Sequence, residues 1–557
     1  MAHINLFALG GQDENGKNCY VLEHQADIFI INVGVKIPIN STNGVDALIP
    51  NFEYLTQRKN RIQGVFITNV KNDNFSAIPW LVMKIPNLKI YTSSYNKTIV
   101  INRLNKYNIS PSQYKVIAFD KDLEFKNLKI QAIPVSGSIP GNLAFLFKLE
   151  FGSFLFMFNY VEGDLKYFGN LNYKNLLAKL DNKPLVGLIT NAGQSNYPAN
   201  AMSRLNLPDY IENVFKESID SNYQIVVGSY DEEMVNLDQI INLCKKYNKK
   251  IVIYGRTYAN LLNLLSKTNL EFGSFLPEIL DHKTIKKHKD CVILFTGKLT
   301  RLYKRFQRVL DNEDAYLKLK SDHRVIMMAP PINGTESLYA SLLDQIAKVT
   351  PYIWDVSDLE LFRSNPTKED LSNLLLALRP KYFLPVAGLY RYLIDSSNYL
   401  KDSAKQNKFN FDSLVLQNGA IARFENDKLI NSNAKIKEVG ETIIDGFGVG
   451  DISSEIVSER ETLGREGAII INVLYSSKPN KPKMILDEIQ IDFTGVTSEE
   501  NFDDIKKLIK ATIVKIISKE KFKSIKELNK RLRKSVRKKI FKTTDKDSVV
   551  ALSFISV

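Results

Sequence analysis

Cysteine and histidine are both scarce in this chain of 557 residues, which has three of the former and five of the latter. The cysteines lie far apart and form no C-x-x-C pair. This excludes a disulfide framework and a zinc knuckle built on thiolates, and it fits a reducing compartment. No two histidines are spaced as H-x-H or H-x-x-x-H; they stand at positions 3, 24, 282, 288 and 323. The sequence therefore disfavours a catalytic centre that needs several imidazole side chains.

Long hydrophobic runs are also lacking. The most apolar stretch, residues 143–161, is interrupted by Lys148 and Glu150, whereas a membrane-spanning helix needs about 20 apolar residues. The first residues, MAHINLFALGG, lack the basic lead and apolar centre of a signal peptide. We therefore expect a cytoplasmic protein with no membrane span. The hydrophobic content of 44% and charged content of 24% are typical of a soluble globular chain, and the length allows two to four domains.

The net charge of +14 is concentrated near the C-terminus. Residues 505–547 hold 17 Lys or Arg and 4 Asp or Glu, a net charge of +13, whereas the remaining residues hold 58 basic and 57 acidic side chains. Apolar residues at helical spacing predict two amphipathic helices here, followed by a strand at 549–557. The basic side chains expected on the polar sides of the second helix are Lys530, Arg531, Arg533, Lys534, Arg537, Lys538 and Lys539.

Three interpretations of this cationic helix are open. It can be a phosphate-binding face, because Lys and Arg that neutralise phosphates give sequence-independent affinity for nucleic acid. It can instead be a solvated helix in a generally lysine-rich chain. A surface that touches anionic lipid is a third interpretation, although the apolar stripe of the helix is more simply used as core.

The order of predicted strands and helices along the chain indicates an inserted domain. The early residues and those after about 380 read as short strands with helices between some of them, which favours an α/β sandwich. Between about 201 and 354, strands alternate with helices of 12 to 18 residues, a βαβ pattern that indicates a parallel sheet. The polar and then glycine-rich segment 431–450 reads as a linker.

The loop after Thr68 follows a short apolar strand and reads Asn-Val-Lys-Asn-Asp-Asn. A loop at a strand end is a common seat for a dinuclear zinc site when it carries histidines and an aspartate. The position of this loop at a strand end suits such a site, but its side chains do not. Only Asp73 offers a carboxylate, and no imidazole is present.

At this point the chain resembles the ribonuclease J family, in the RNA-processing branch of the metallo-β-lactamase superfamily. The resemblance rests on the opening FALGGQDENGKN, on INGTE at 332–336, on RPKYFLPV at 379–386 and on DGFGVGD at 445–451. It implies an αββα metallo-β-lactamase sandwich interrupted by a β-CASP α/β insert, with a small C-terminal α+β domain. The expected boundaries are 1–195 with 355–430 for the core, 196–354 for the insert, 431–450 for the linker and 451–557 for the basic C-terminal domain.

The departures from the family are as systematic as the matches. The resemblance implies zinc ligands at positions where this chain holds other residues; the degenerate ligand positions are Asn32, Asn69, Lys71, Asp73, Asn74, Gly137, Asn159 and Ala387. The family's acidic residue at the start of the insert is similar in place to Asn191. Lys71 would put an ammonium where the metal charge belongs, and amides avoid the repulsion of a carboxylate cluster without a cation. We therefore expect no catalytic residue, with Asp73 as a vestige, and no metal cofactor, although zinc serves the parent family.

Two classes of function follow, with a third as an alternative. The first is a non-catalytic subunit that binds RNA or holds an active ribonuclease J paralogue, as a homo- or hetero-oligomer. The second is a weak 5′-to-3′ exoribonuclease or endoribonuclease with an altered site, using Asp73 and Lys71 or the acidic run 231–233 with Mg²⁺. The third is a protein-interaction module whose basic helix meets an acidic partner. The resemblance also implies that Arg363, Ser364 and Asn365 descend from a substrate loop and contact an RNA backbone.

Overall fold

The computed structural model describes residues 3–38, 45–119, 121–219, 223–445, 448–449, 454–476, 483–496, 502–519 and 524–556. The chain divides into two compact units. The first comprises residues 1–40 and 47–442, and the second comprises residues 41–46 and 443–557.

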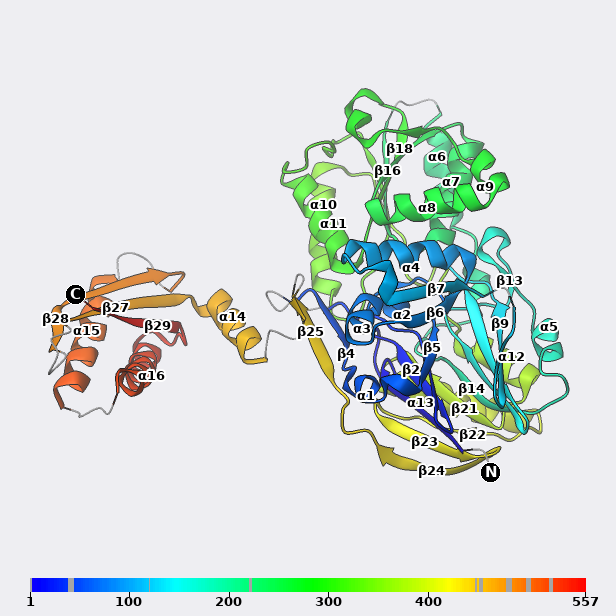
Figure 1. The fold of residues 1–557 in the computed structure, drawn as a ribbon. Helices are drawn as coiled ribbons and strands as arrows, with labels where there is room; N and C mark the ends of the chain where they lie inside the picture. Colours follow the sequence, from blue (N-terminus) through cyan, green and yellow to red (C-terminus); the bar gives the residue numbers. More distant parts are fainter. Residues whose placement is uncertain are drawn as a thin grey trace. The chain divides into compact units, whose positions relative to one another are not determined.

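Two sheets of the first unit face each other and form a sandwich (Figure 1). In sheet order, the larger sheet consists of β24 (Lys428–Lys435), β23 (Ala420–Glu425), β1 (His3–Gly10), β2 (Cys19–His24), β3 (Asp27–Ile31), β5 (Ile62–Phe66), β6 (Leu88–Thr92) and β7 (Tyr114–Ala118). The other consists of β22 (Asp412–Ser413), β21 (Tyr382–Val386), β14 (Leu185–Asn191), β11 (Gly152–Met157), β10 (Leu143–Leu149), β9 (Leu128–Pro134) and β8 (Leu123–Phe125).

Aromatic side chains join the two sheets. Phe29 and Phe66 of the larger sheet contact Phe147 of the other, each with ring centroids 5.7 Å apart and near-perpendicular planes. This geometry is favourable for ring quadrupoles beyond the burial of apolar area. The strands supply alternate residues to this core, as expected for sheets that pack face to face.

Helices cover the outer faces of the sandwich. The helices α5 (Tyr173–Ala178), α12 (Lys368–Leu378) and α13 (Tyr390–Gln406) bury leucines in one cluster with strands of the smaller sheet. On the other side α4 (Ser94–Lys106) packs against α3 (Ile78–Lys84) and β7. The shorter elements of this unit are β4 (Ala47–Pro50), α1 (Glu53–Gln57), α2 (Asn72–Phe75), β12 (Gly163–Asp164) and β13 (Asn170–Leu171).

The chain leaves the sandwich after β14 and builds a second α/β layer before it returns at α12 (Figure 1). Every pair of neighbouring strands in this sheet is parallel. Its strands, in sheet order, are β17 (Ile279–Leu280), β16 (Lys250–Tyr254), β18 (Cys291–Gly297), β15 (Ile225–Tyr230), β19 (Arg324–Met328) and β20 (Ile353–Asp355). Its helices are α6 (Asp209–Glu217), α7 (Met234–Lys246), α8 (Arg256–Thr268), α9 (Leu270–Phe275), α10 (Leu299–Leu310) and α11 (Glu336–Val349). The predicted α/β sandwich with an α/β insert is therefore confirmed.

A three-stranded sheet of the second unit packs against two helices. The sheet order is β28 (Lys483–Thr494), β27 (Ala468–Ser476) and β29 (Val549–Ser556). The helices α15 (Phe502–Lys519) and α16 (Ile525–Thr544) share a hydrophobic cluster with this sheet, and α14 (Ser454–Glu466) precedes it. The apolar stripe expected for α16 is the buried one: Leu528, Leu532, Val536 and Ile540.

The segment that we expected to be a linker, 431–450, contains regular structure. The strand β24 pairs with β23 as far as Lys435, and β25 (Glu441–Asp445) pairs with β26 (Gly448–Val449). The glycine-rich residues 446, 447 and 450 of this segment lie outside the described residues. Among the helices that the structure describes, none has both the length and the hydrophobicity to cross a bilayer.

Candidate functional site

A cavity of about 410 Å³ lies where the sandwich meets the insert. Its walls come from the loops after β3, β5, β11, β14 and β21 of the sandwich and after β15 and β18 of the insert. Within each sheet of the sandwich these strands run parallel. Because the carboxyl ends of parallel strands meet at one edge, their following loops converge, and this edge is where α/β folds place their sites.

The first residue or two beyond a strand often adopts left-handed backbone geometry here. Asn32 and Asn159 have φ values of 62° and 51°, which asparagine accepts more readily than most residues. Ala387, just after β21, has a φ of 55°. Its N–H donates to the carbonyl of Gly11 at 2.8 Å, and this contact helps to hold a conformation that is unfavourable for alanine.

Buried asparagine side chains form hydrogen bonds with one another next to the cavity, and one of them, Asn159, lines it. Asn74 Nδ2 donates to Asn69 Oδ1 and to Asn159 Oδ1, both at 2.8 Å. Asn69 Nδ2 also donates to Asn159 Oδ1, at 3.2 Å. All three side chains are buried. Because a carboxamide both donates and accepts, these groups satisfy each other without any counter-ion.

The network of amides continues on both sides. Asn32 Oδ1 accepts from the N–H and the hydroxyl of Thr68 at 2.9 and 3.0 Å, and Asn32 Nδ2 donates to Asn74 at 3.2 Å. At the other end, Asn365 Oδ1 accepts from Asn159 Nδ2 at 2.7 Å and from Asn191 Nδ2 at 3.0 Å. We refer to Asn32, Asn69, Asn74, Asn159, Asn191 and Asn365 as the amide cluster.

Gly137 leaves room for a further amide beside the cluster. A Cβ atom at position 137 would lie 2.8 Å from Asn142 Nδ2 and 2.8 Å from the Asn159 carbonyl oxygen. Asn142 uses this space: its Nδ2 donates to the carbonyls of Phe158 and Asn159, and its Oδ1 accepts from Asn69 at 3.1 Å. A larger residue at 137 therefore has no space unless both the Asn142 side chain and the backbone at Asn159 move.

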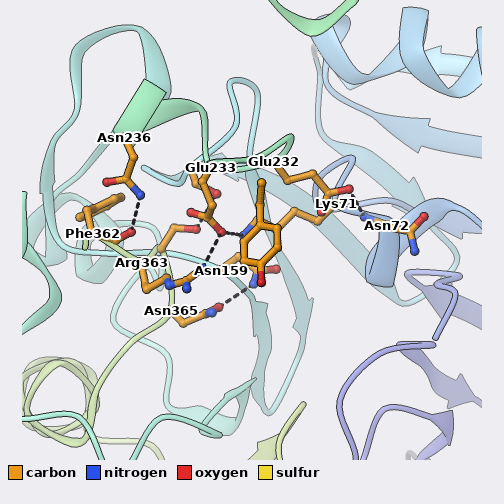
Figure 2. Close-up of polar contacts among 12 residues, drawn as sticks. Lys71, Asn72, Asn159, Glu232, Glu233, Asn236, Phe362, Arg363 and Asn365 are labelled. Carbon is orange, nitrogen blue, oxygen red and sulfur yellow. Dashed lines mark hydrogen bonds and ion pairs between the residues drawn. The ribbon is translucent and has the colours of Figure 1, made fainter. Parts of the chain in front are cut away.

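The loop of Lys71 is tied to the insert by charge (Figure 2). Lys71 Nζ lies 3.4 Å from Glu233 Oε1, and Arg363 contacts the same oxygen at 3.5 Å while it also bonds Asp358. Lys71 and Glu233 are both buried. Burial alone raises the pKa of the Glu233 carboxyl, but Lys71 and Arg363 more than offset this and hold that pKa below its ordinary value.

The other acids of the run 231–233 have different surroundings. Glu232 Oε1 lies 3.4 Å from Lys298 Nζ and accepts from the N–H of Asn72 at 3.1 Å. Asp231 is buried, and this burial raises the pKa of its carboxyl. Two of the three carboxylates are thus occupied by cationic side chains, which leaves them poorly placed to share an Mg²⁺ ion.

Asp73 takes part in the local hydrogen bonding through its backbone carbonyl, whereas one oxygen of its carboxylate does not. Its carbonyl oxygen accepts from the N–H of Asn18 at 2.9 Å, while its Oδ1 atom has no hydrogen-bond partner among the described residues. Burial raises the pKa of the Asp73 carboxyl to about 6, although Lys71 opposes part of that rise. A carboxyl in this state is partly protonated near neutral pH.

Comparisons with known proteins give the relationship. The family models "Ribonuclease J, beta-CASP domain" and "Ribonuclease J C-terminal domain" match residues 222–346 and 455–557. Ribonuclease J2 of Bacillus subtilis is 23% identical over 481 residues, 84% of this chain and 83% of that one. Ribonuclease J of Mycoplasma genitalium is 22% identical, over 95% of this chain and 92% of that one. The chain is thus similar to ribonuclease J proteins along most of its length and matches the models of two of their domains.

Other relatives include proteins without a described activity. "Uncharacterized protein MG423" of Mycoplasma genitalium is 28% identical over 576 residues and covers the whole of both chains. Among solved structures, a protein of unknown function from Enterococcus faecalis is similar in fold, with a TM-score of 0.51 and 13% identity over 76% of this chain and 100% of that one.

Zinc, which the resemblance to the ribonuclease J family implies, does not suit the side chains of this cavity. Zinc takes imidazole, thiolate and carboxylate ligands, whereas carboxamides and the ammonium of Lys71 stand at most of the ligand positions. Three of the carboxylates that line the cavity, those of Glu232, Glu233 and Asp358, are paired with Lys298, Lys71 and Arg363. Within the described residues, no three His, Cys, Asp or Glu side chains are placed to hold a metal ion. These side chains therefore support no reaction step through a metal.

The structure brings most of the sequence-predicted positions together. Asn32, Asn69, Asn74 and Asn159 lie in the amide cluster, and the cavity is lined by Lys71, Asp73, Asn159 and Ala387. Of the predicted substrate loop, Arg363 and Asn365 line the cavity but are bonded within the protein. Ser364 is buried, and its hydroxyl donates to Ser138 at 2.9 Å. A contact between these three residues and RNA stays a prediction.

Sequence reasoning missed the residues that complete the site. Asn142 follows the Ser-Ile-Pro-Gly turn and nothing in its neighbourhood marks it as a partner of Asn69. Asn18, whose Nδ2 donates to Asn74 at 2.7 Å, stands in the opening string that carries the family resemblance, and this is the one signal that could have pointed to it. The contact of Glu233 with Lys71 has no local signal in the sequence, because it spans 162 positions of the chain.

The basic side chains predicted on α16 are placed in the second unit, separately from the cavity. All seven, from Lys530 to Lys539, are exposed. Arg537 is bonded to both carboxylate oxygens of Asp547, at 2.5 and 2.6 Å. Their role in RNA binding stays a prediction.

Proposed function

We propose that this protein is a cytoplasmic ribonuclease J-like subunit that has lost metal-dependent hydrolysis, binds RNA, and serves as a scaffold or regulator in RNA processing and decay. The observation that supports the loss most directly is the ammonium of Lys71 beside the amide cluster. Hydrolysis by a metal centre needs an ion that lowers the pKa of a bound water and stabilises the charge developing on phosphate. The Lys71 ammonium is paired with the Glu233 carboxylate, and neither it nor the neutral amides can supply a metal-bound water.

The retained architecture supports a binding role. The models of the family's β-CASP domain and C-terminal domain both match this chain, which supports a fold retained around an altered site. Mycoplasma genitalium has both a protein similar to this chain along its full length and a ribonuclease J. By analogy, we propose an active ribonuclease J as the partner, in a homo- or hetero-oligomer.

The test uses the full-length protein with a 5′-monophosphorylated single-stranded RNA. We expect the RNA to be bound and recovered intact under conditions where an active ribonuclease J degrades it. If the basic face of α16 carries the affinity, binding should fall by about three decades between 50 and 200 mM salt. Reversal of Arg533, Lys534, Arg537 and Lys538 to Glu should weaken binding of all RNA sequences alike.

Two results would favour the other classes of function. Shortening of the RNA that disappears in Asp73→Asn would point to a weak ribonuclease with an altered site. A reversal variant that binds RNA normally but no longer associates with an active ribonuclease J would make α16 a protein-docking surface.

A further inference from the structure

A groove of about 600 Å³ lies in the second unit, where three elements meet. α14 contributes Ser458, Glu459 and Thr462, and Val549 and Val550 of β29 supply apolar surface. The remaining wall is one side of α16, with Arg533, Lys534, Arg537, Lys538 and Phe541, and Asp547 follows that helix. Four of the seven basic residues predicted on α16 therefore line the groove, next to apolar surface.

The charge of this groove favours an anionic ligand. Four cationic side chains face two carboxylates, those of Glu459 and Asp547. The bidentate bond to Asp547 holds the Arg537 guanidinium in place, whereas Arg533, Lys534 and Lys538 are exposed. Cations on successive turns of a helix form a row, because residues three and four positions apart share one face. Such a row suits a chain of phosphates better than a single small anion.

The ring of Phe541 favours nucleic acid over other anions as the ligand of this groove. It stands one turn after Arg537 and Lys538, lines the same groove, and is 48% exposed. A large aromatic side chain that stays open to solvent beside a row of cations is the combination found in grooves for single strands. There, cations follow the backbone and aromatic rings stack on unpaired bases. In a duplex the bases are already stacked, so this ring would gain little from one.

We propose that this groove binds single-stranded RNA, with Lys534 and Lys538 on phosphates and Phe541 stacked on a base. The inference rests on the proposed RNA-binding function and deepens it by naming the site and the form of RNA. An acidic peptide would use the cations and leave the ring of Phe541 without a partner, so it fits the groove less completely. Ser458 and Thr462 on the opposite wall offer hydroxyls to the same backbone.

The experiment measures binding of the full-length protein to two fluorescent 12-nucleotide probes by anisotropy. One is single-stranded RNA, and the other is the same backbone with abasic positions. The groove pair Lys534→Glu with Lys538→Glu is compared with the control pair Lys526→Glu with Lys542→Glu, which changes the charge equally on the same helix but outside the groove. We expect the groove pair to weaken binding at least tenfold more than the control pair.

Phe541→Ala tests stacking without a change of charge. We expect it to weaken binding of the ordinary RNA about tenfold and to leave binding of the abasic probe unchanged, since a lost stack affects only a probe with bases. Phe541→Tyr, which keeps an aromatic ring, should restore the affinity. Thermal unfolding of each variant checks that the second unit is intact.

The outcomes are distinct. Equal losses in the groove and control pairs, or an equal loss for both probes in Phe541→Ala, would overturn the groove while RNA binding itself stands. Displacement of RNA by polyglutamate at an equal concentration of charge would also overturn it, in favour of an acidic protein partner. A wild-type chain that binds neither probe would refute the proposed function and, with it, this inference.

Discussion

The ammonium of Lys71 lies 3.4 Å from the carboxylate of Glu233, in the buried region where a loop of the sandwich meets the insert. The resemblance to the family aligns Lys71 with a zinc-binding histidine, so a protein cation stands at a position from which a ribonuclease J holds its metal. The carboxylate of Glu233 pairs with that cation and also with the guanidinium of Arg363. The pair thus also joins two layers of the first unit.

Removal of the shared carboxylate should destabilise the first unit. Glu233→Gln leaves Lys71 and Arg363 buried with one counter-charge fewer, and breaking a buried ion pair in this way costs about 3 kcal/mol. The two tryptophans, Trp80 and Trp354, both lie in the first unit, so urea unfolding followed by tryptophan fluorescence measures the loss there. Glu232→Gln is the matched control. Its contact with Lys298 is more exposed, and its loss should stay within about 1 kcal/mol.

The pH dependence of that loss has a definite sign. The folded-state pKa of Glu233 is lowered, so its contribution is complete above the ordinary pKa of a carboxyl and is lost as the pH falls through the folded pKa. The difference between wild type and Glu233→Gln should therefore be large at pH 7 and should shrink below about pH 4. A difference that does not change with pH would show that the ion pair is not its cause.

Asp73→Asn should stabilise the protein at neutral pH. The folded-state pKa of Asp73 is raised to about 6, so the folded state holds the proton more tightly than the unfolded state, and stability falls as the pH rises from about 4 to 6. The amide removes this loss, and its gain should grow over the same range to about 2–3 kcal/mol at pH 7. Urea unfolding at pH 4.5, 6 and 7.5 measures it. A destabilised variant at pH 7.5 would mean that the carboxylate has a cationic partner, such as a bound metal.

Much of the fold and part of the candidate site could be predicted from the sequence, because the relevant patterns are local. The alternation of strands and helices predicts the insert, and the spacing of Leu528, Leu532 and Val536 predicts the buried stripe of α16. The run of amides and Lys71 after β5 predicts a cavity unsuited to zinc. Each of these inferences uses residues within a few turns or one loop of each other.

The contacts that complete the site are distant in sequence. Glu233 reaches Lys71 across 162 positions, and Asn142 reaches Asn69 across 73. Neither partner has a local pattern that announces it. The groove of the second unit likewise needs α14 beside α16, an arrangement that helical periodicity alone does not give.

Restoring a carboxylate inside the amide cluster should be harmful. In Asn159→Asp an oxygen replaces the Nδ2 atom that donates to Asn365 Oδ1 at 2.7 Å, and a buried charge gains no counter-ion. We expect the free energy of unfolding to fall by about 3 kcal/mol. The exposed Asn60→Asp serves as the control and should change stability by less than about 0.5 kcal/mol. Recovery of the Asn159→Asp variant on addition of zinc would show that a metal-binding arrangement survives, contrary to our account.

The loss of the metal centre is most directly tested by elemental analysis of the full-length protein, purified without chelator, beside a nuclease assay on the same preparation. We expect well under one zinc or manganese per chain and intact 5′-monophosphorylated RNA, with an active ribonuclease J as the positive control. Stoichiometric metal that is lost in Asp73→Ala, together with RNA hydrolysis that is lost in the same variant, would contradict the account.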